Sequence, residues 1–409
     1  MRNLLPEILP SWITRYFVGS SLFCLSVLFS CSHSRGQDDI QTGAERTDMY
    51  LSMLPGKNLG IVANQTSVIG GVHLVDSLIS IGSGTAMIQQ VFCPEHGFRG
   101  EAEAGLFIED GIDTKTGLPV VSLYGKNRKP SAEVFEDLDA IIFDIQDVGA
   151  RFYTYISTLF YVMQACAENG KQLILLDRPN PNGFYVDGPI LDTNYRSFVG
   201  MNEVPVVYGM TIGEYGLMIN GEGWLGKGLV CDLKVIPCLN YDHTMFYVLP
   251  VSPSPNLPTM NSIYLYPSTC FFEGTVLSEG RGTDFPFEVF GHPLLENTDF
   301  SFVPESIPGK SANPKWKGET CLGMDLRYLR ESTERDPQIN LGWLMFAYEN
   351  YPEKAAFFTP YFEKLAGTAR LRRQILEGKT EEKIRSGWSD GLAAFKKIRK
   401  KYLLYPDFE

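Results

Sequence analysis

An acid and an imidazole stand side by side in the segment Pro94-Glu95-His96-Gly97, which follows the apolar run of residues 86–92. Glu95 has the chemistry of a general acid, because apolar neighbours disfavour the charged form of a carboxyl group. His96 could orient Glu95 or tune its charge. Two plainer interpretations stay open: Glu95 could cap a turn through backbone N–H groups, and His96 could be a loop residue that faces solvent.

Two further carboxylates, Asp147 and Asp177, also follow apolar runs, and an arginine lies close to each of them in the sequence. Hydrolysis of a glycosidic bond requires two carboxyl groups that flank the bond, and their separation sets the stereochemical outcome. The sequence does not supply that separation. For each aspartate, an ordinary ion pair with the neighbouring arginine is the alternative interpretation.

Four arginines, Arg99, Arg151, Arg178 and Arg281, lie within or beside these polar segments. A bidentate guanidinium is the usual partner of a carboxylate, so such a set would suit a sugar that carries an acid group. Each arginine could equally be structural. Tyr155 could stack on a sugar face, although packing in the core is the favoured interpretation for an aromatic residue at helical spacing.

The elements that must position these side chains alternate between strands and helices. Apolar runs predict strands at residues 58–64, 86–92, 119–123, 140–145 and 172–176, and helical patterns lie at residues 73–81, 131–137 and 152–169. Near-continuous apolarity is typical of strands that are covered on both faces. We therefore expect an α/β fold with a Rossmann-like, doubly wound and mostly parallel sheet, whose ligands bind beyond the carboxyl ends of the strands.

Several cofactor and reaction classes lack their motifs in this chain. The first predicted strand is not followed by GxGxxG, and GxxxxGK[ST] does not occur, so we expect no dinucleotide or nucleotide cofactor. HExxH and CxxC are also missing, which disfavours a metal site. The nucleophile elbow GxSxG of serine hydrolases is absent. The six cysteines from Cys93 to Cys321 are scattered, and we expect buried thiols.

Residues 1–31 have the pattern of a lipoprotein signal peptide, in which an uncharged run ends in Leu28-Phe29-Ser30-Cys31. We expect lipidation at Cys31 and a protein exported to the cell envelope, which would contact the membrane through its lipid anchor only; an ordinary signal peptide is the alternative. Residues 32–47 are expected to be a tether. The length that remains predicts a Rossmann-like catalytic domain at residues 48–226 and a smaller α+β domain at residues 227–409 that caps the cleft. In the second domain, short β-prone segments are expected at residues 229–236, 270–277 and 320–326, and a mostly helical pattern follows at residues 341–402.

The formal charge of −12 argues against a nucleic-acid partner. The basic run at residues 396–401 does not change this expectation, because a solvated helix face explains it.

Six motifs span most of the chain after the tether, in the order Asn64-Gln65-Thr66, residues 94–100, residues 143–155, residues 177–181, residues 254–258 and residues 279–283. Together they make the chain closely resemble the exo-β-N-acetylmuramidases of the NamZ type. The resemblance implies a Rossmann-like domain, a smaller C-terminal domain and a cleft between them. It implies hydrolytic removal of terminal, non-reducing N-acetylmuramic acid from peptidoglycan fragments, with muramyl sugars as partners and no cofactor.

On this resemblance Glu95 is the expected catalytic acid, and Asp177 and Asp147 are ranked candidates for the second catalytic group. The expected substrate-binding residues are Asn64, His96, Arg99, Gln146, Arg151, Tyr155, Arg178, Asn180, Asn256, Glu279 and Arg281. Two other functions stay open. A tethered lipoprotein could bind wall fragments without cleaving them, and an amidase could act on the peptide stem, although that reaction would more naturally call for zinc.

Overall fold

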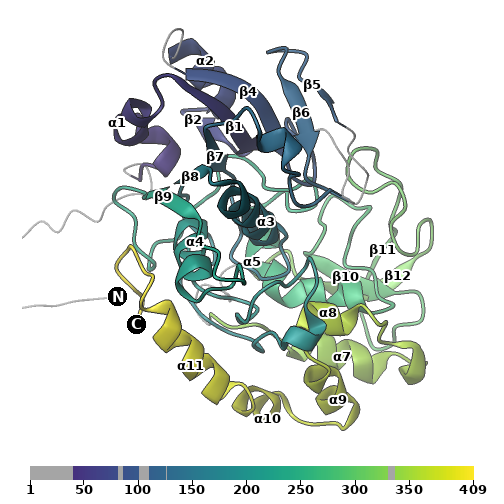
Figure 1. Ribbon diagram of the computed structural model, residues 1–409. Helices are drawn as coiled ribbons and strands as arrows, with labels where there is room; N and C mark the ends of the chain where they lie inside the picture. The colour runs from purple at the N-terminus through teal and green to yellow at the C-terminus, as the bar shows by residue number, and fades with distance from the viewer. Residues whose placement is uncertain (1–39, 82–85, 101–109, 126, 330–336) are drawn as a thin grey trace, which may run out of the picture. The chain divides into compact units, whose positions relative to one another are not determined.

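The computed structural model describes residues 40–81, 86–100, 110–125, 127–329 and 337–409. Within them, a seven-stranded sheet has the order β5-β6-β4-β1-β7-β8-β9 (Figure 1). Its strands are β1 (Lys57–Ala63), β4 (Ala86–Cys93), β5 (Gly111–Ile112), β6 (Pro119–Ser122), β7 (Ala140–Asp144), β8 (Gln172–Leu176) and β9 (Asp232–Ile236). All neighbours pair in parallel except β5 and β6. The parallel sheet and the five predicted strands are confirmed.

The central strands β7 and β8 are buried almost throughout, which is why they are apolar along nearly their whole length. In β7, Ile141 and Phe143 belong to one hydrophobic cluster, while Ala140 and Ile142 belong to the other. The first cluster includes α3 (Tyr155–Asn169) and α4 (Ile212–Gly221), and the second includes α1 (Thr47–Tyr50) and α2 (Leu74–Ile81). Figure 1 shows these two pairs of helices on opposite sides of the sheet.

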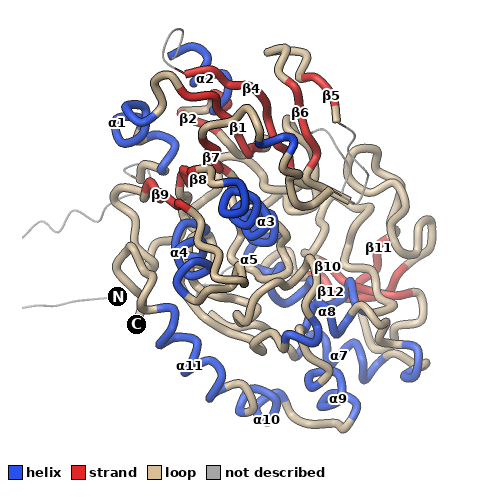
Figure 2. Tube along the Cα trace, in the orientation of Figure 1, coloured by secondary structure: helices blue, strands red, loops and turns tan. Residues whose placement is uncertain are grey.

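The second half of the chain adds α5 (Met260–Thr269) and a small antiparallel sheet in the order β10-β12-β11. That sheet consists of β10 (Val289–His292), β11 (Phe300–Phe302) and β12 (Cys321–Asp325), and a two-stranded β2 (Val68–Ile69) and β3 (Val72–His73) lies earlier in the chain. Helices follow as α7 (Gly342–Asn350), α8 (Phe362–Ala366), α9 (Arg370–Leu376), α10 (Glu381–Ser386) and α11 (Ser389–Arg399). Figure 2 shows the strands in two groups, with α7, α8 and α9 near the smaller group and α11 farther away, below α4.

One segment differs from its expected conformation. Residues 270–277 were expected to be β-prone, but Cys270–Gly274 form the 3₁₀ helix η6, which directly continues α5. The prediction is wrong because the apolar run buries its side chains around a helix. Phe271 packs against Phe362 of α8, and Phe272 stacks on Phe290 of β10.

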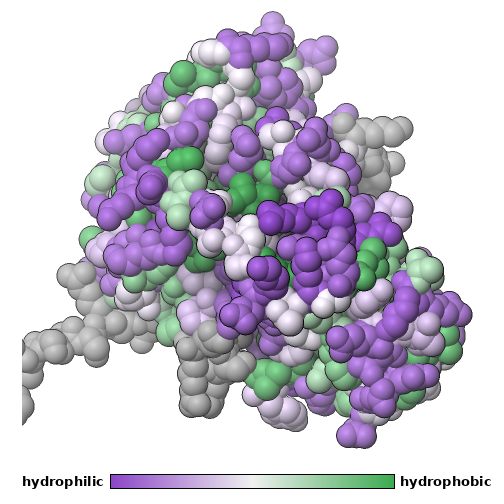
Figure 3. Space-filling view, turned by 90° about the horizontal axis from the view of Figure 1, so that it is seen from below, coloured by the Kyte–Doolittle hydropathy of each residue, from purple (hydrophilic) through white to green (hydrophobic). Residues whose placement is uncertain are grey.

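Strand β9 joins the large sheet beside β8, so the sheet continues past residue 226, where the sequence predicted a domain boundary. Contacts among the described residues from 40 to 409 group them as one compact unit. In the face seen in Figure 3, hydrophilic side chains cover most of the surface and the hydrophobic areas between them are small.

Residues 40–47, which the sequence placed in the tether, are packed on the sheet. The Gly43 N–H donates to the Asp177 carbonyl at 2.7 Å, and Ala44 is fully buried. A Cβ at Gly43 would lie 2.3 Å from the Ile236 carbonyl oxygen, so only glycine allows this approach. The signal peptide, Cys31 and residues 32–39 lie outside the described residues. Within the described residues, no helix has the length and hydrophobicity of a membrane-spanning segment.

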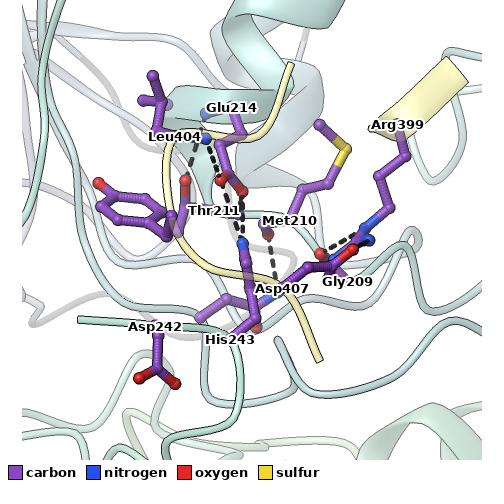
Figure 4. Close-up of polar contacts among 12 residues, drawn as sticks. Gly209, Met210, Thr211, Glu214, Asp242, His243, Arg399, Leu404 and Asp407 are labelled. Carbon is purple, nitrogen blue, oxygen red and sulfur yellow. Dashed lines mark hydrogen bonds and ion pairs between the residues drawn. The ribbon is translucent and has the colours of Figure 1, made fainter. Parts of the chain in front are cut away.

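A buried polar cluster holds residues 404–407 against α4 (Figure 4). Glu214 of α4 is fully buried, accepts the Leu404 N–H at 2.8 Å and lies 3.0 Å from His243 Nε2. The guanidinium of Arg399, at the end of α11, pairs with Asp407 at 2.8 Å. These contacts join the last helix to the sheet domain.

Candidate active site

A cavity of about 340 Å³ lies beyond the carboxyl end of β4. Its wall is built by the loop after β4, the start of α3, residues 197–199 and 254–257, η6 and the segment around α8. Both halves of the chain therefore contribute. A volume of this size is at the small end of the range for ligand pockets, and it suits one sugar unit better than a continuous glycan chain.

Glu95 and His96 both line this cavity, as the sequence predicted. They sit in a tight turn, in which the Gly97 N–H donates to the Pro94 carbonyl at 3.1 Å and His96 adopts a positive φ of 73°. His96 is buried, so the interpretation of a solvent-facing loop residue is wrong for it. The turn holds the Glu95 side chain at the cavity wall, half-buried.

Two hydroxyl groups border the Glu95 carboxylate. Thr154, the residue before α3, places its Oγ1 3.5 Å from Glu95 Oε2. Burial raises the pKa of Tyr124 above its usual value, and the nearby negative charge of Glu95 raises it further. Neither hydroxyl carries a signal in the sequence, because Tyr124 follows a strand as an ordinary aromatic residue and Thr154 precedes a helix as an ordinary cap.

A second carboxylate in the cavity is Glu273 of η6, which sequence reasoning missed. The Arg281 guanidinium pairs with Glu273 at 2.6 Å and with Glu279 at 3.2 Å. Burial alone would lower the pKa of Arg281, but these two carboxylates raise it above its usual value. Arg281 lines the cavity, whereas the buried Glu279 lies behind it and also contacts Lys315 at 3.4 Å. Glu273 was missed because residues 270–277 were expected to be β-prone, whereas they include the 3₁₀ helix that places Glu273 at the cavity.

Asp147 does not line the cavity. It is buried, and its Oδ2 accepts hydrogen bonds from the Tyr208 hydroxyl and, at 2.8 Å, from the Gly149 N–H. Its Oδ1 has no hydrogen-bond partner. Burial raises the pKa of Asp147 to about 6, although the two hydrogen bonds work in the opposite direction. The Asp147 carboxylate therefore sits in the core and cannot touch a substrate held in the cavity.

Asp177 is also absent from the cavity wall, and it is fully enclosed. Its carboxylate accepts hydrogen bonds from the hydroxyls of Thr211 and Tyr405 and from the Gly213 N–H. Burial raises the pKa of Asp177 to about 6, and the charge of Glu214 adds to the rise. The Asp177 carboxylate connects the carboxyl end of β8 to the start of α4 and to Tyr405, so its contacts are those of a structural residue.

The other predicted arginines are structural too. Arg178 forms a buried ion pair with Asp144 at 2.6 Å. Arg99 pairs with Asp76 at 3.1 Å and with Asp113 at 2.8 Å. The fully buried Arg151 donates to the carbonyls of Pro189, Val204 and Leu365 at 2.8 to 2.9 Å, and burial lowers its pKa to about 9. Arg99, Arg151 and Arg178 do not line the cavity.

Among the predicted amide and tyrosine residues, Asn256 and Tyr155 line the cavity. Asn256 donates to the Lys310 carbonyl at 2.9 Å, and the Tyr155 hydroxyl donates to the Pro253 carbonyl at 3.2 Å. The remaining three amides form hydrogen bonds with residues of neighbouring turns and do not line the cavity: Asn64, Gln146 and Asn180. The expectation that ligands bind beyond the carboxyl ends of the strands therefore indicated the correct edge of the sheet. It did not distinguish the residues that line the cavity from those that stabilise turns.

Within the described part of the chain, no group of three or more His, Cys, Asp or Glu residues is arranged to hold a metal ion. The six described cysteines are buried as free thiols. The chemistry that the cavity wall itself offers is that of two carboxylates, several phenol and hydroxyl groups and three cationic side chains, Arg128, Arg281 and Lys364.

Comparison with known proteins gives a consistent result. Residues 59–261 match the family model described as exo-β-N-acetylmuramidase NamZ, N-terminal, and residues 264–405 match its C-terminal counterpart. The peptidoglycan β-N-acetylmuramidase NamZ of Bacillus subtilis (strain 168) is 39% identical over 384 residues, which are 90% of this chain and 91% of that protein.

Two crystal structures of DUF1343 family proteins from Bacteroides fragilis NCTC 9343 have the same fold. The first is 46% identical with a TM-score of 0.84, and the second is 29% identical with a TM-score of 0.75. Each comparison covers 90% of this chain and 99% of the other.

Proposed function

Because this chain belongs to the NamZ family of exo-β-N-acetylmuramidases, we propose that it hydrolyses the terminal, non-reducing N-acetylmuramic acid from peptidoglycan fragments. The observation that carries this proposal is the placement of Glu95 and Glu273 in the wall of one cavity of sugar size. Most glycoside hydrolases use a pair of Asp or Glu carboxyl groups as their catalytic residues. A pocket for a single sugar unit suits removal of terminal residues.

In the proposed mechanism, Glu95 protonates the departing glycosidic oxygen while positive charge builds on the sugar ring. Thr154 and Tyr124 orient its carboxyl group. Glu273 takes the role for which the sequence suggested Asp177 or Asp147: it stabilises the ring charge or activates water, and Arg281 holds it in place. Attack by the acetamido group of the substrate on its own anomeric carbon is the alternative to a protein nucleophile.

The first test replaces Glu95 by glutamine, which keeps the size of the side chain but cannot donate the proton. We expect kcat to fall by at least about 100-fold on a muramyl disaccharide, whose aglycone needs protonation. The loss should be smaller on 4-nitrophenyl β-N-acetylmuramide, because nitrophenolate departs without a proton. Near-normal turnover of the disaccharide by this variant would remove Glu95 from the mechanism.

A matched variant, Glu273→Gln, tests the second carboxylate. We expect a loss of about 100-fold or more on both substrates, because the charge on the ring develops whichever aglycone departs. Equal activity of this variant and the unmodified protein would return the second role to the acetamido group. Unfolding curves of both variants, compared with that of the unmodified protein, exclude a loss of fold.

We also propose that the protein is exported and that Cys31 is lipidated at the cell envelope, on the sequence pattern of residues 28–31. Mass spectrometry of the mature N-terminus should find a lipid-modified Cys31, and Cys31→Ala should abolish the modification. An N-terminus that begins elsewhere without lipid would contradict the proposal. The net charge of −12 gives no support for a nucleic-acid partner.

A further inference from the structure

Two cationic side chains of the cavity wall, Arg128 and Lys364, have no carboxylate partner among the described residues. The third, Arg281, is matched by Glu273 and Glu279. In a chain with a formal charge of −12, positive side chains of a concave site to which the described residues offer no counter-ion are unusual. Their charge is available to a ligand.

The position of the Arg128 side chain is fixed by an aromatic neighbour. Its guanidinium stacks over the Phe198 ring at 4.3 Å from the centroid, and Phe198 itself lines the cavity. Stacking fixes the plane of the guanidinium but leaves its edge N–H groups free to form a bidentate pair. Its Nε is buried without a hydrogen-bond partner, and so is the hydroxyl of Ser197, another residue of the cavity wall. A buried donor without an acceptor is costly unless a ligand supplies one.

Lys364 of α8 reaches the same cavity from the other half of the chain. It is half-buried and forms no ion pair with any described residue. Because Lys364 and Arg128 come from distant segments of the chain, their two positive charges come together only in the folded protein. Three arginines that the sequence suggested for recognition of an acid group already have partners within the protein: Arg99, Arg151 and Arg178.

We propose that Arg128 and Lys364 bind the lactyl carboxylate of N-acetylmuramic acid and so select muramyl over glucosaminyl ends. This inference rests on the proposed function and assigns its specificity. The two sugars differ by the lactyl ether, whose carboxylate is the one charged group that a recognition site can use. A planar guanidinium matches both carboxylate oxygens, and an ammonium adds a second positive charge.

The test compares 4-nitrophenyl β-N-acetylmuramide with its lactyl methyl ester, which has nearly the same shape but no negative charge. For Arg128→Gln and for Lys364→Met, we expect kcat/KM on the acid to fall by about 10- to 100-fold, mainly through KM, because a charge-assisted hydrogen bond is lost. On the ester, both variants should stay within about twofold of the unmodified protein. The preference for acid over ester should therefore collapse.

Lys129→Gln is the matched control, since Lys129 adjoins Arg128 but pairs with Glu168 at 2.7 Å on the surface. It should leave the preference unchanged. Lys364→Arg should retain most of the preference, which a merely structural role would not require. Equal losses on acid and ester, or an unchanged preference in both Arg128→Gln and Lys364→Met, would overturn the assignment.

Direct binding separates this inference from the proposed function. If the unmodified protein does not hydrolyse either muramide, the proposed function fails. Calorimetry with free N-acetylmuramic acid and its methyl ester then still decides the inference. Tighter binding of the acid that disappears in Arg128→Gln supports it, whereas equal affinities for acid and ester refute it.

Discussion

The buried Asp147 carboxyl should make the stability of this protein fall as the pH rises from about 4 to about 6. Replacement by asparagine tests this cleanly, because both hydrogen bonds of Asp147, from Tyr208 and from Gly149, go to the same oxygen. Asparagine can keep that oxygen in place and put its amide nitrogen where Oδ1 has no partner. The variant therefore removes the charge and leaves the local contacts.

The sign and size follow from the pKa. Burial raises the pKa of Asp147 from 3.8 to about 6, so the folded state binds the proton more tightly than the unfolded chain does. The stability that this proton confers is fully present below about pH 4 and is lost as the pH rises through about 6. At about 1.36 kcal/mol for each pH unit, the loss is about 3 kcal/mol. Asparagine carries no such proton, so this part of the pH dependence disappears.

The assay is urea unfolding of the unmodified protein and Asp147→Asn at pH 4, 5, 6 and 7. Relative to the unmodified protein, the variant should gain about 3 kcal/mol of unfolding free energy across this range. Asp177 titrates in the same range in both proteins and cancels in the difference. Parallel curves for the two proteins would refute the reasoning, because they would show that the Asp147 carboxyl is not destabilised by burial.

Asp113→Asn is the control with the opposite sign. Its hydrogen bonds with Arg99 lower the pKa of Asp113 to about 2, so its stabilising effect is present above about pH 4 and is lost only as the pH falls toward 2. Its difference from the unmodified protein should stay nearly constant between pH 5 and 7. Asp147→Asn should also keep muramidase activity within a few-fold, since Asp147 does not line the cavity.

Three other outcomes follow from the packing. Arg178→Met should destabilise the fold by about 3 to 5 kcal/mol in urea unfolding, because it strands the buried charge of Asp144; a loss below about 1 kcal/mol would contradict a buried pair. Gly149→Ala should cost about 2 kcal/mol or more in the same assay, since Gly149 has a φ of 75° and a Cβ there would lie 2.2 Å from Asn180 Oδ1. A brief pulse of thiol reagent under native conditions, mapped by mass spectrometry, should leave the six described cysteines unmodified because all are buried.

The sheet could be predicted from the sequence because its central strands are buried on both faces. That burial forces a continuous apolar run, and each of the five predicted strands lies within about two residues of its observed position. The 3₁₀ helix η6 shows the limit of this rule. Its run Cys270-Phe271-Phe272 is as apolar as a strand, but the contacts of Phe271 with α8 and Phe272 with β10 decide its shape. Such contacts between distant segments leave no local pattern.

The site was only partly predictable for a related reason. A strand end indicates at which edge of the sheet a side chain lies, but not whether it points into the cavity or into the core. Glu95 and Asp147 both follow strands, yet only Glu95 faces the cavity. Glu273 and Lys364 follow no strand of the large sheet, and Arg128 lies in the long loop beyond β6, so the fold alone brings the three together.

Because of the contacts of residues 404–407, the stability of the sheet domain depends on the last residues of the chain. Glu214 accepts a hydrogen bond from the Leu404 N–H, 190 residues later in the chain, and Asp177 accepts one from the Tyr405 hydroxyl, 228 residues later. Until that segment docks, each of these buried carboxylates has only its nearer partners, among them Thr211 and His243 for Glu214 and Thr211 and Gly213 for Asp177. A nascent chain that still lacks residues 404–405 cannot form all the hydrogen bonds of these two carboxylates, so we expect the native state to reach its full stability only when the C-terminal segment is available.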